Sequence, residues 1–423
     1  MTPFIRKTLP NGLRVIVVPM PYSLTATVLV LTATGSKYET KKLSGVSHFL
    51  EHMCFKGTVK RPSADAISEE LDGLGARYNA FTGQEYTGYY AKVEKSLLPK
   101  ALDVVADLFQ NATLPAKEMD IERGVIVGEI EMYEDTPQRH VSDVFMELLY
   151  GDQPAGWNIA GTRETARGMT RDEMADYRRD HYVAEDSVVI VAGNVDGNTV
   201  LNDIEKAFDS PSHGAKSGKP AVDDGQEKPA VQISKYDSRQ THFLLGFRSF
   251  NIYDDRQKVA RLLAAFLGGG MSSRLFKRVR TEMGAGYYIG ADNDFFTDHG
   301  FLSVATGVDN KRVKEVVSAV LEELARAKDE LLSEEELTRT KNFLIGNLFA
   351  GLETSDAIAS YYGEKEILGR PMKTPEEIAK GVRAVSAEEI RDLAREIFVE
   401  KNLNLALVGP YESGDEFLPL LKI

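Results

Sequence analysis

Apolar residues follow two spacings along this chain, an alternation that is typical of strands and a recurrence every three or four positions that is typical of helices. The strand pattern comes first: residues 4–6 precede a Pro-Asn-Gly sequence at 10–12, and four β-branched residues follow at 15–18. Because Asn-Gly favours a two-residue hairpin loop, we expect the chain to open with two antiparallel strands. With an opening of this kind we expect no signal peptide in the sequence.

The pattern near the end of each half of the chain is the same. Residues 169–195 and 385–411 match without a gap at a constant offset of 216. Each copy predicts a helix that begins with a capping box and a buried strand that ends at a glycine. The residues of these two features are Thr170/Glu173 with 187–192, and Ser386/Glu389 with 403–408.

A second match pairs Gly-Ala-Arg-Tyr at 75–78 with Gly-Ala-Gly-Tyr at 284–287, and strand-like sequence follows both. Two matches in the same order indicate a duplicated unit. The first copy of the helix that follows the opening strands, at 44–55, carries polar residues where its rough equivalent, at 255–266, carries apolar ones. A duplicated fold that has kept its chemistry in one half would show this difference.

Residues 210–229 lack aromatic residues and apolar periodicity, as expected of an exposed linker. We therefore expect a first domain at 1–209, the linker, and a homologous second domain at 230–423. The predicted fold class is α/β (α+β), with a mainly antiparallel sheet covered by helices in each domain.

The composition fits a globular protein that buries a large core, since 43% of the 423 residues are hydrophobic and 27% are charged. Lys and Arg total 51 against 64 Asp and Glu, a net charge of −13, which disfavours nucleic acid and anionic membranes as partners. No apolar run is long enough to span a membrane. The single cysteine, Cys54, cannot form an intrachain disulfide and is expected to pack in the core. We expect a cytoplasmic protein, or a periplasmic one if a signal peptide has been removed.

The candidate chemistry begins with the sequence H-x-x-E-H. On a helix His48 and His52 project from one face, close enough to bind one zinc ion, and Glu51 lies beside them as a candidate base. The alternative is a pair of core histidines next to a solvated glutamate.

A catalytic zinc site needs a third protein ligand and one open position for water. Glu129 is the candidate, because it lies in an apolar stretch of a predicted helix that ends before Pro137. A carboxylate there would be costly to bury unless a cation met it. The alternative is a glutamate turned to solvent on an amphipathic helix.

Several blocks in a fixed order resemble the pitrilysin/insulinase family of inverted-motif zinc metallopeptidases, most closely its short bacterial members related to the mitochondrial processing peptidase. The matching blocks are residues 9–13, 48–58, 79–82, 122–129 and 268–276. The resemblance implies that His48, His52 and Glu129 bind one zinc ion per chain. It also implies two catalytic glutamates: Glu51 as the general base, and Glu122 as a support of the zinc site from behind its ligands.

The same resemblance implies a substrate-binding role for Asn79, Ala80 and Phe81, as part of an edge strand to which an extended peptide adds. In the second half it implies that Arg280 and Tyr287 clamp the substrate and help to stabilise the oxyanion. Without the resemblance, residues 79–82 would be an ordinary strand, Arg280 a surface residue and Tyr287 a core residue.

The resemblance implies a zinc endopeptidase that hydrolyses unfolded peptides in an enclosed chamber. Four such domains form a clamshell in that family, and this chain supplies two, so a homodimer is expected, or a heterodimer with a homologue that lacks the motif. The alternative function is a non-catalytic scaffold or partner subunit of a processing peptidase. Such subunits typically lose motif residues, whereas His48, Glu51, His52 and Glu129 are all present here.

Overall fold

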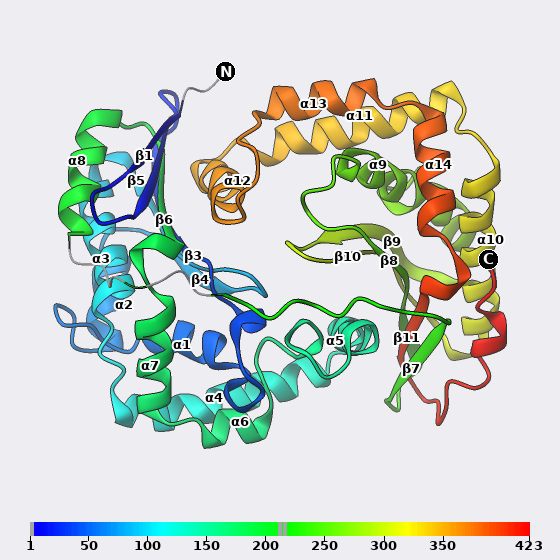
Figure 1. The fold of residues 1–423 in the computed structure, drawn as a ribbon, viewed down its shortest axis with the longest axis horizontal. Helices are drawn as coiled ribbons and strands as arrows, with labels where there is room; N and C mark the ends of the chain where they lie inside the picture. Colours follow the sequence, from blue (N-terminus) through cyan, green and yellow to red (C-terminus); the bar gives the residue numbers. More distant parts are fainter. Residues whose placement is uncertain (1–3, 210–213, 215–217) are drawn as a thin grey trace. The chain divides into compact units, whose positions relative to one another are not determined.

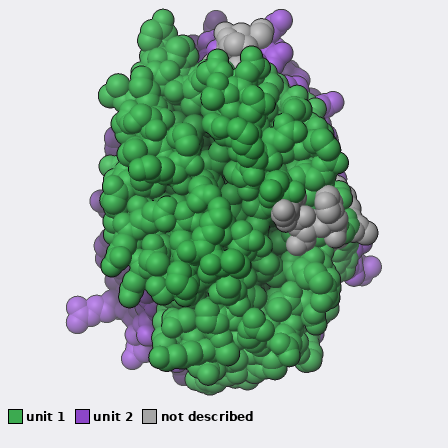
Figure 2. Space-filling view, turned by 90° about the vertical axis from the view of Figure 1, so that its left-hand side faces the viewer, with its two compact units in different colours: residues 1–130, 158–220, 350–372 green, residues 131–157, 221–349, 373–423 purple. Residues whose placement is uncertain are grey.

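A computed structural model describes residues 4–209, 214 and 218–423 of the chain. The contacts divide the chain into two compact units. The first unit consists of Met1–Ile130, Asn158–Pro220 and Ala350–Met372, and the second of Glu131–Trp157, Ala221–Phe349 and Lys373–Ile423. The separate segments of the first unit form one continuous surface (Figure 2).

The first unit is built on a mixed sheet with the strand order β1-β2-β6-β3-β5-β4 among the described residues (Figure 1). Only the neighbours β2 and β6 run parallel in this sheet; its other neighbours are antiparallel. The opening hairpin predicted from Asn11-Gly12 is therefore confirmed as β1 and β2. The strands are β1 (Ile5–Thr8), β2 (Arg14–Pro19), β3 (Thr25–Thr32), β4 (Arg77–Thr82), β5 (Thr87–Glu94) and β6 (Ser187–Gly193).

The second unit repeats this arrangement with the order β7-β11-β8-β10-β9 and a single parallel pair, β7 with β11. Both sheets are thus mainly antiparallel, as the sequence predicts. The strands are β7 (Ala230–Lys235), β8 (Gln240–Ser249), β9 (Gly286–Phe295), β10 (Gly300–Asp309) and β11 (Leu403–Gly409).

The duplication extends to single residues. Strands β6 and β11 are offset by 216 positions, and each follows a helix with the predicted capping box. Gly75 and Gly284, which precede the equivalent strands β4 and β9, both have φ of +60°, a conformation that glycine adopts without strain. The two units therefore share one fold, as expected of a duplicated unit.

Helices cover both faces of the first sheet. Helix α3 packs on β3 and β5, and α12 packs on β3 and β6. The helices with all or most of their residues in this unit are α1 (Val46–Cys54), α2 (Ala64–Gly73), α3 (Leu98–Asn111), α4 (Ala116–Glu134), α6 (Arg163–Gly168), α7 (Arg171–His181), α8 (Gly197–Ala207) and α12 (Ser355–Ile367).

Helices cover the second sheet in the same manner, with α9 against β9 and α5 against β8 and β11. A π-helix at Phe276–Glu282 leads into β9. The α-helices are α5 (Pro137–Tyr150), α9 (Gln257–Gly268), α10 (Val313–Asp329), α11 (Glu334–Gly351), α13 (Pro375–Ala384) and α14 (Ala387–Ile397).

One helix of each unit comes from the other half of the sequence (Figure 1). Helix α12 covers the face of the first sheet that carries Leu31 and Ile190, whose side chains lie against Gly363. Helix α5 covers the second sheet, where Phe145 packs with Leu244 and Ala406. The compact units therefore do not coincide with the two sequence halves, 1–209 and 230–423. The predicted domain bounds describe the repeat along the sequence, and they stay a prediction. Residues 210–213 and 215–217 of the linker lie outside the described residues.

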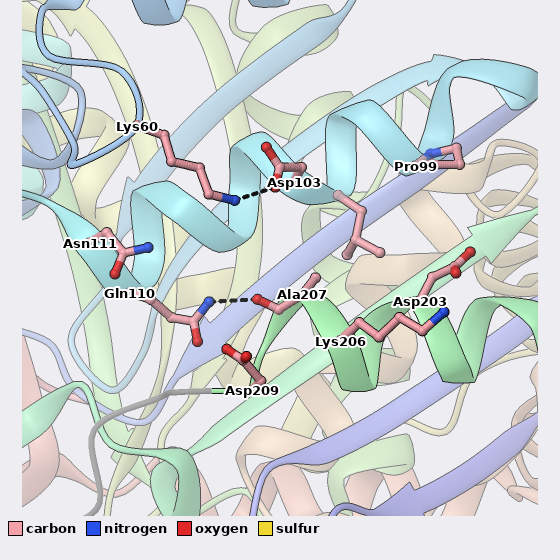
Figure 3. Close-up of a pocket in the computed structure, with 10 residues that line it drawn as sticks. Lys60, Pro99, Asp103, Gln110, Asn111, Asp203, Lys206, Ala207 and Asp209 are labelled. Carbon is pink, nitrogen blue, oxygen red and sulfur yellow. Dashed lines mark hydrogen bonds and ion pairs between the residues drawn. The ribbon is translucent and has the colours of Figure 1, made fainter.

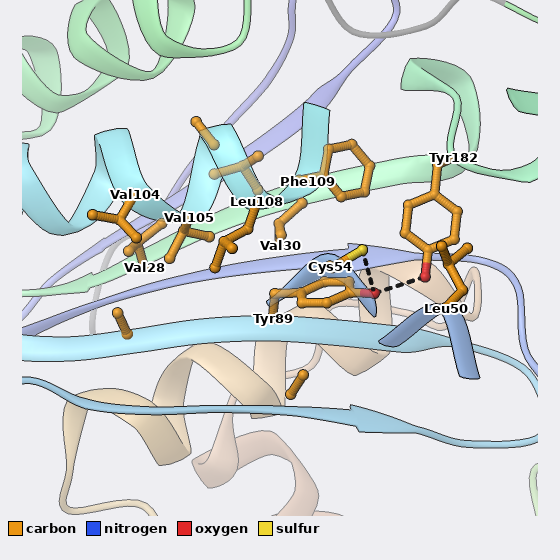
Figure 4. Packing of buried hydrophobic residues seen from close by; sticks show 14 of the residues in the cluster. Val28, Val30, Leu50, Cys54, Tyr89, Val104, Val105, Leu108, Phe109 and Tyr182 are labelled. Carbon is orange, nitrogen blue, oxygen red and sulfur yellow. Dashed lines mark hydrogen bonds between the residues drawn. The ribbon is translucent and has the colours of Figure 1, made fainter. Parts of the chain in front are cut away.

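The core of the first unit lies between its sheet and helices α1, α3 and α7. Val28 and Val30 of β3 meet Val104, Val105 and Leu108 of α3 (Figure 4). Cys54 is fully buried there, as predicted, and the hydroxyl of Tyr89 lies 3.5 Å from its sulfur and 2.9 Å from the hydroxyl of Tyr182. The last turn of α1 is therefore packed firmly against the sheet. Among the described residues, no helix combines the length and the apolar character that crossing a bilayer requires.

Candidate metal centre

Helix α1 presents the H-x-x-E-H residues on the face that it does not bury. Val46, Phe49, Leu50 and Met53 point into the core, so His48, Glu51 and His52 are left on the opposite, half-buried side. The spacing of apolar residues along α1 thus decides which side of the helix carries the chemistry.

Two features fix the start of this helix. Gly45 has φ of +89°, and a Cβ there would lie 2.5 Å from the carbonyl oxygen of Ala160, so only glycine fits. The buried carboxylate of Glu39 accepts hydrogen bonds from the backbone N–H groups of Gly45 at 2.6 Å and Ser47 at 2.8 Å. Burial raises the pKa of Glu39 to about 7, although these hydrogen bonds work in the opposite direction.

The structure brings together the three predicted zinc ligands (α1 and α4 in Figure 1). Glu129 Oε2 lies 3.5 Å from Nε2 of His48 and 3.5 Å from Nε2 of His52. Tetrahedral ligands that hold zinc at about 2.0–2.1 Å lie about 3.3–3.4 Å from one another. The spacing of these atoms therefore suits one zinc ion.

Hydrogen bonding gives an independent test of this fit. Glu129 Oε2 is buried and has no hydrogen-bond partner among the described residues. A buried carboxylate oxygen without a donor is costly, and a cation between it and the two imidazoles would remove the cost. The residues present thus fit a zinc ion, and the Glu129 carboxylate faces the histidines rather than bulk solvent.

Glu122 contacts His52 on the ring nitrogen that does not face Glu129. Its Oε1 is 2.9 Å from His52 Nδ1, and its Oε2 is 2.7 Å from Nζ of Lys56. A carboxylate at Nδ1 keeps a proton on that nitrogen and leaves Nε2 free to bind a metal. Glu122 therefore contacts a predicted ligand, and the role that the resemblance implies for it, support of the zinc site, stays a prediction.

The two histidines titrate differently. Burial, with a smaller contribution from the neighbouring His52, lowers the pKa of His48 to about 4, so this imidazole is neutral near pH 7. Burial also acts to lower the pKa of His52, but the hydrogen bond to Glu122 and the nearby carboxylates outweigh it and raise that pKa. Burial, reinforced by Glu129, raises the pKa of Glu51.

Residues 79–82 lie in β4, the last strand of the first sheet, which has β5 as its only strand neighbour among the described residues. β4 is thus an edge strand of this sheet, the place in the fold that the resemblance implies for residues 79–82. Asn79 is exposed, Phe81 is partly buried, and Ala80 is buried on the alternate face. Thr82, the last residue of β4, donates a hydrogen bond to Glu51 Oε2 at 2.6 Å.

Arg280 and Tyr287 lie in the second unit, on the π-helix and on β9. Both side chains are exposed, so the alternative interpretation of Tyr287 as a core residue is wrong. An Arg280 guanidinium nitrogen donates to the carbonyl oxygen of Gly286 at 3.1 Å, which places the guanidinium beside the residue before Tyr287. The structure thus brings these two residues together as accessible neighbours.

A separate pocket of about 510 Å³ lies between α3 and α8 (Figure 3). Two pairs of its lining groups contact each other: Lys60 contacts Asp103 at 2.5 Å, and Gln110 donates to the carbonyl oxygen of Ala207 at 2.8 Å. Its lining contains none of the predicted site residues. The candidate metal centre is therefore not in this hollow.

The sequence analysis gives no role to Glu39 and Lys56, and it includes Thr82 only as part of the edge strand at 79–82, without its contact with Glu51. Alternation along residues 78–82 indicates that Thr82 shares a face with Ala80, but it does not say that this face meets α1. Lys56 follows the end of α1, so helical spacing could not place it against Glu122. No local pattern marks Glu39.

Comparison with known proteins shows which family this chain is similar to. Residues 14–163 match a family model described as insulinase (peptidase family M16), and residues 168–344 match one described as the peptidase M16 inactive domain. A Bacillus subtilis protein named an uncharacterized zinc protease, YmxG, is 36% identical over 409 residues, which cover 96% of this chain and 98% of that protein. A Rickettsia felis protein with the same description is 34% identical and covers 95% of this chain and 96% of its own length.

Solved structures agree on the fold. A structure described as a protease from Helicobacter pylori aligns with a TM-score of 0.89 over 97% of this chain and 100% of its own, at 22% sequence identity. A Pseudomonas fluorescens structure described as a peptidase M16 inactive domain also reaches 0.89, over 97% of this chain and 98% of its own, at 17% identity. At these identities the similarity concerns the fold alone.

Proposed function

The chain belongs to the insulinase family, peptidase family M16, and from that premise we propose that it is a zinc-dependent endopeptidase that hydrolyses unfolded peptides. The observation that carries this proposal is the buried, unpartnered Oε2 of Glu129, which lies 3.5 Å from the Nε2 atoms of both histidines. The half-buried carboxylate of Glu51 lies on the same face of α1.

His48, His52 and Glu129 would hold the zinc ion. Bound there, zinc would polarise the peptide carbonyl and lower the pKa of a coordinated water to about 7. Glu51 would take a proton from the attacking water and transfer it to the leaving amide nitrogen. Glu122 would keep His52 in the tautomer that presents Nε2, and Lys56 would keep Glu122 ionised. Hydrolysis by this route forms no covalent intermediate with the protein.

Substrate binding would use the open edge of β4. An extended peptide that adds to this edge gains main-chain hydrogen bonds whatever its side chains are, so selection would depend on flexibility more than on sequence. Arg280 and Tyr287 would clamp the peptide and donate to the developing oxyanion. Their exposure in the second unit supports this role.

The test is cleavage of a flexible peptide of about 20–40 residues, a length suited to an enclosed site. Three samples are compared: the zinc-loaded protein, the same protein with chelator, and Glu51→Gln. We expect cleavage by the first sample alone, while Glu51→Gln retains about one zinc per chain by metal analysis. A zinc-loaded wild type that cuts no peptide, even at high enzyme concentration, would contradict the proposal.

The second candidate is a non-catalytic scaffold or partner subunit. The match of residues 168–344 to an inactive-domain model is the observation that favours it. However, this match covers mostly the half without the motif, where Val259, Leu262 and Leu263 are buried apolar residues. Zinc binding without cleavage in the test above would support this candidate.

We also infer a homodimer, because the chain supplies two repeat units of the four that the resemblance implies, and because it carries both the zinc motif and the Arg/Tyr pair. If the clamp of one protomer serves the zinc of the other, mixing Glu51→Gln with Arg280→Ala protomers restores one intact site in each mixed dimer. Full subunit exchange would then recover about a quarter of the wild-type activity. No recovery, although mass measurements show mixed dimers, would place both elements of a site in the same protomer.

A further inference from the structure

Side chains of strand β4 contact helix α1 and the residue that follows it. Thr82 Oγ1 donates to Glu51 Oε2, and the ring of Tyr78 stacks on Phe55 with centroids 6.4 Å apart. Tyr78 and Thr82 lie on one face of the strand, because side chains four residues apart point the same way. These contacts therefore fix how α1 lies on the inner face of β4.

The hairpin beyond Thr82 is firmly anchored. The backbone N–H groups of Ser36 and Lys37 donate to the carbonyl oxygens of Gly83 at 3.2 Å and Gln84 at 3.0 Å. The buried Lys37 ammonium pairs with the buried Glu85 carboxylate at 3.0 Å. Thr82 is thus held at the end of a strand whose turn cannot easily move.

The hydroxyl of Thr82 has one hydrogen to donate, and it is directed at one of the two carboxylate oxygens of Glu51. Hydrogen bonds from a hydroxyl to a carboxylate are short and directional, so this contact favours one rotamer of Glu51. The contact occupies Oε2 of Glu51 and leaves its other oxygen, Oε1, available for proton transfer. Without the hydroxyl, the side chain of Glu51 would be free to rotate about its own torsions.

We propose that Thr82 is a positioning residue, whose hydroxyl orients the general base Glu51 from the strand that offers its open edge to the peptide. This inference rests on the proposed peptidase function, and it connects the strand that binds the peptide to the residue that acts as the base. Because one anchored strand places both the substrate backbone and the base, the two are kept in a fixed register with each other.

The test compares the zinc-loaded wild type with Thr82→Val, which keeps the shape and loses the hydroxyl, and Thr82→Ser, which keeps the hydroxyl. Thr87→Val is the matched control: Thr87 pairs with Thr82 across the hairpin, and its hydroxyl donates to the carbonyl oxygen of Thr34 instead. Zinc content and thermal stability are measured for each protein.

We expect Thr82→Val to lower kcat about 10- to 100-fold with KM within about twofold of wild type. Thr82→Ser should recover kcat to within about threefold of wild type, and Thr87→Val should leave it within that range. A rise in KM at unchanged kcat, or an equal loss in Thr82→Val and Thr82→Ser, would overturn the proposal.

A crystallographic comparison of the zinc-free proteins separates this inference from the proposed function. We expect the Glu51 carboxylate to lie within hydrogen-bond distance of residue 82 in wild type and Thr82→Ser, and to adopt another rotamer in Thr82→Val. The same Glu51 rotamer in all three would overturn the positioning role, whether or not the wild type cuts peptides. An inactive wild type with the expected rotamers would overturn the peptidase function and retain the positioning role.

Discussion

His48 and His52 differ in what contacts Nδ1, the ring nitrogen that does not face Glu129. In His52 this atom, Nδ1, lies 2.9 Å from Glu122, which Lys56 holds in turn. In His48 the corresponding Nδ1 is buried and has no hydrogen-bond partner among the described residues. The orientation of His52 is therefore set by a charged pair, and that of His48 by packing alone.

Glu122→Gln should consequently weaken zinc binding through His52. The amide keeps a polar contact with Nδ1 but loses the charge that favours its proton, so we expect about a 10- to 100-fold loss of zinc affinity. Competition with a chromogenic chelator measures the loss. Asp120→Asn, an exposed change on the same helix, is the control. Equal affinities for Glu122→Gln and wild type would show that Glu122 does not support the site.

Glu39 predicts a pH dependence of stability. Its pKa is raised to about 7 in the folded protein and would be near 4.5 in the unfolded chain. Between these values the unfolded state binds fewer protons at Glu39, so the contribution of this residue to stability is greatest below about pH 4.5 and falls as the pH rises to about 7. Full ionisation would cost about 3 kcal/mol.

Glu39→Gln removes this titration. The amide cannot accept both backbone hydrogen bonds, which lowers stability by an amount that does not depend on pH. Urea unfolding of both proteins, with chelator present, should show the stability of wild type falling relative to the variant between about pH 5 and pH 8. A difference that stays constant over this range would mean that Glu39 is ionised in the folded protein throughout.

At the scale of elements, α12 is tied to the first sheet by polar contacts as well as by packing. The hydroxyl of Ser355 lies 2.8 Å from that of Thr27, and the buried Glu366 carboxylate pairs with Arg6 at 2.9 Å and lies 3.6 Å from Arg14. Burial lowers the pKa of Arg14, and Glu366 partly offsets that effect. The helix therefore neutralises cations of the opening hairpin.

Glu366→Ala should destabilise the first unit by about 1–2 kcal/mol, because Arg14 loses its carboxylate partner but keeps its hydrogen bonds to the carbonyl oxygens of Ser187 and residue 366. Denaturant unfolding followed by circular dichroism measures the change. Glu353→Ala, an exposed change just before the same helix, should have an effect below about 0.5 kcal/mol. If the two variants are equally stable, the pairing of Glu366 with these arginines contributes little.

Sequence reasoning succeeds for elements whose evidence is local. The opening hairpin, the capped helices before β6 and β11, and the strands that follow residues 75–78 and 284–287 all depend on residues within a few positions of one another. The face of α1 that carries His48 and His52 also follows from local spacing.

Sequence reasoning cannot identify which elements pack together when they lie far apart in the sequence. The apolar face of α12 requires a sheet, but nothing in its residues says that the sheet belongs to the first half. The contact of Thr82 with Glu51, which is 31 positions away, likewise depends on how elements pack. The predicted roles of Arg280 and Tyr287 came from the resemblance, since their local sequence predicted a surface and a core residue.

At the scale of the whole molecule, the exchange of α5 and α12 makes each compact unit depend on both halves of the chain. A cut in the linker would leave α12 packed on the first sheet and α5 packed on the second. Neither fragment could separate without exposing an apolar sheet face.

A specific protease site inserted near Gly218 tests this dependence. We expect the two fragments to co-elute in gel filtration after complete cleavage and to separate only in denaturant. A linker cut with separate elution of folded fragments would show that the exchanged helices are dispensable. The uncut protein with the same insertion is the control for effects of the insertion itself.

The exchange also dictates the order of events during protein synthesis. The strands of the first sheet are complete when Gly193 has been made, but one face of that sheet stays uncovered until residues Ser355–Ile367 follow, about 160 residues later. At a translation rate of about 5–20 residues per second, that apolar face is exposed on the ribosome for about ten to thirty seconds. The nascent chain thus passes through an interval in which a chaperone has a natural binding surface, and that interval ends only when the second half supplies α12.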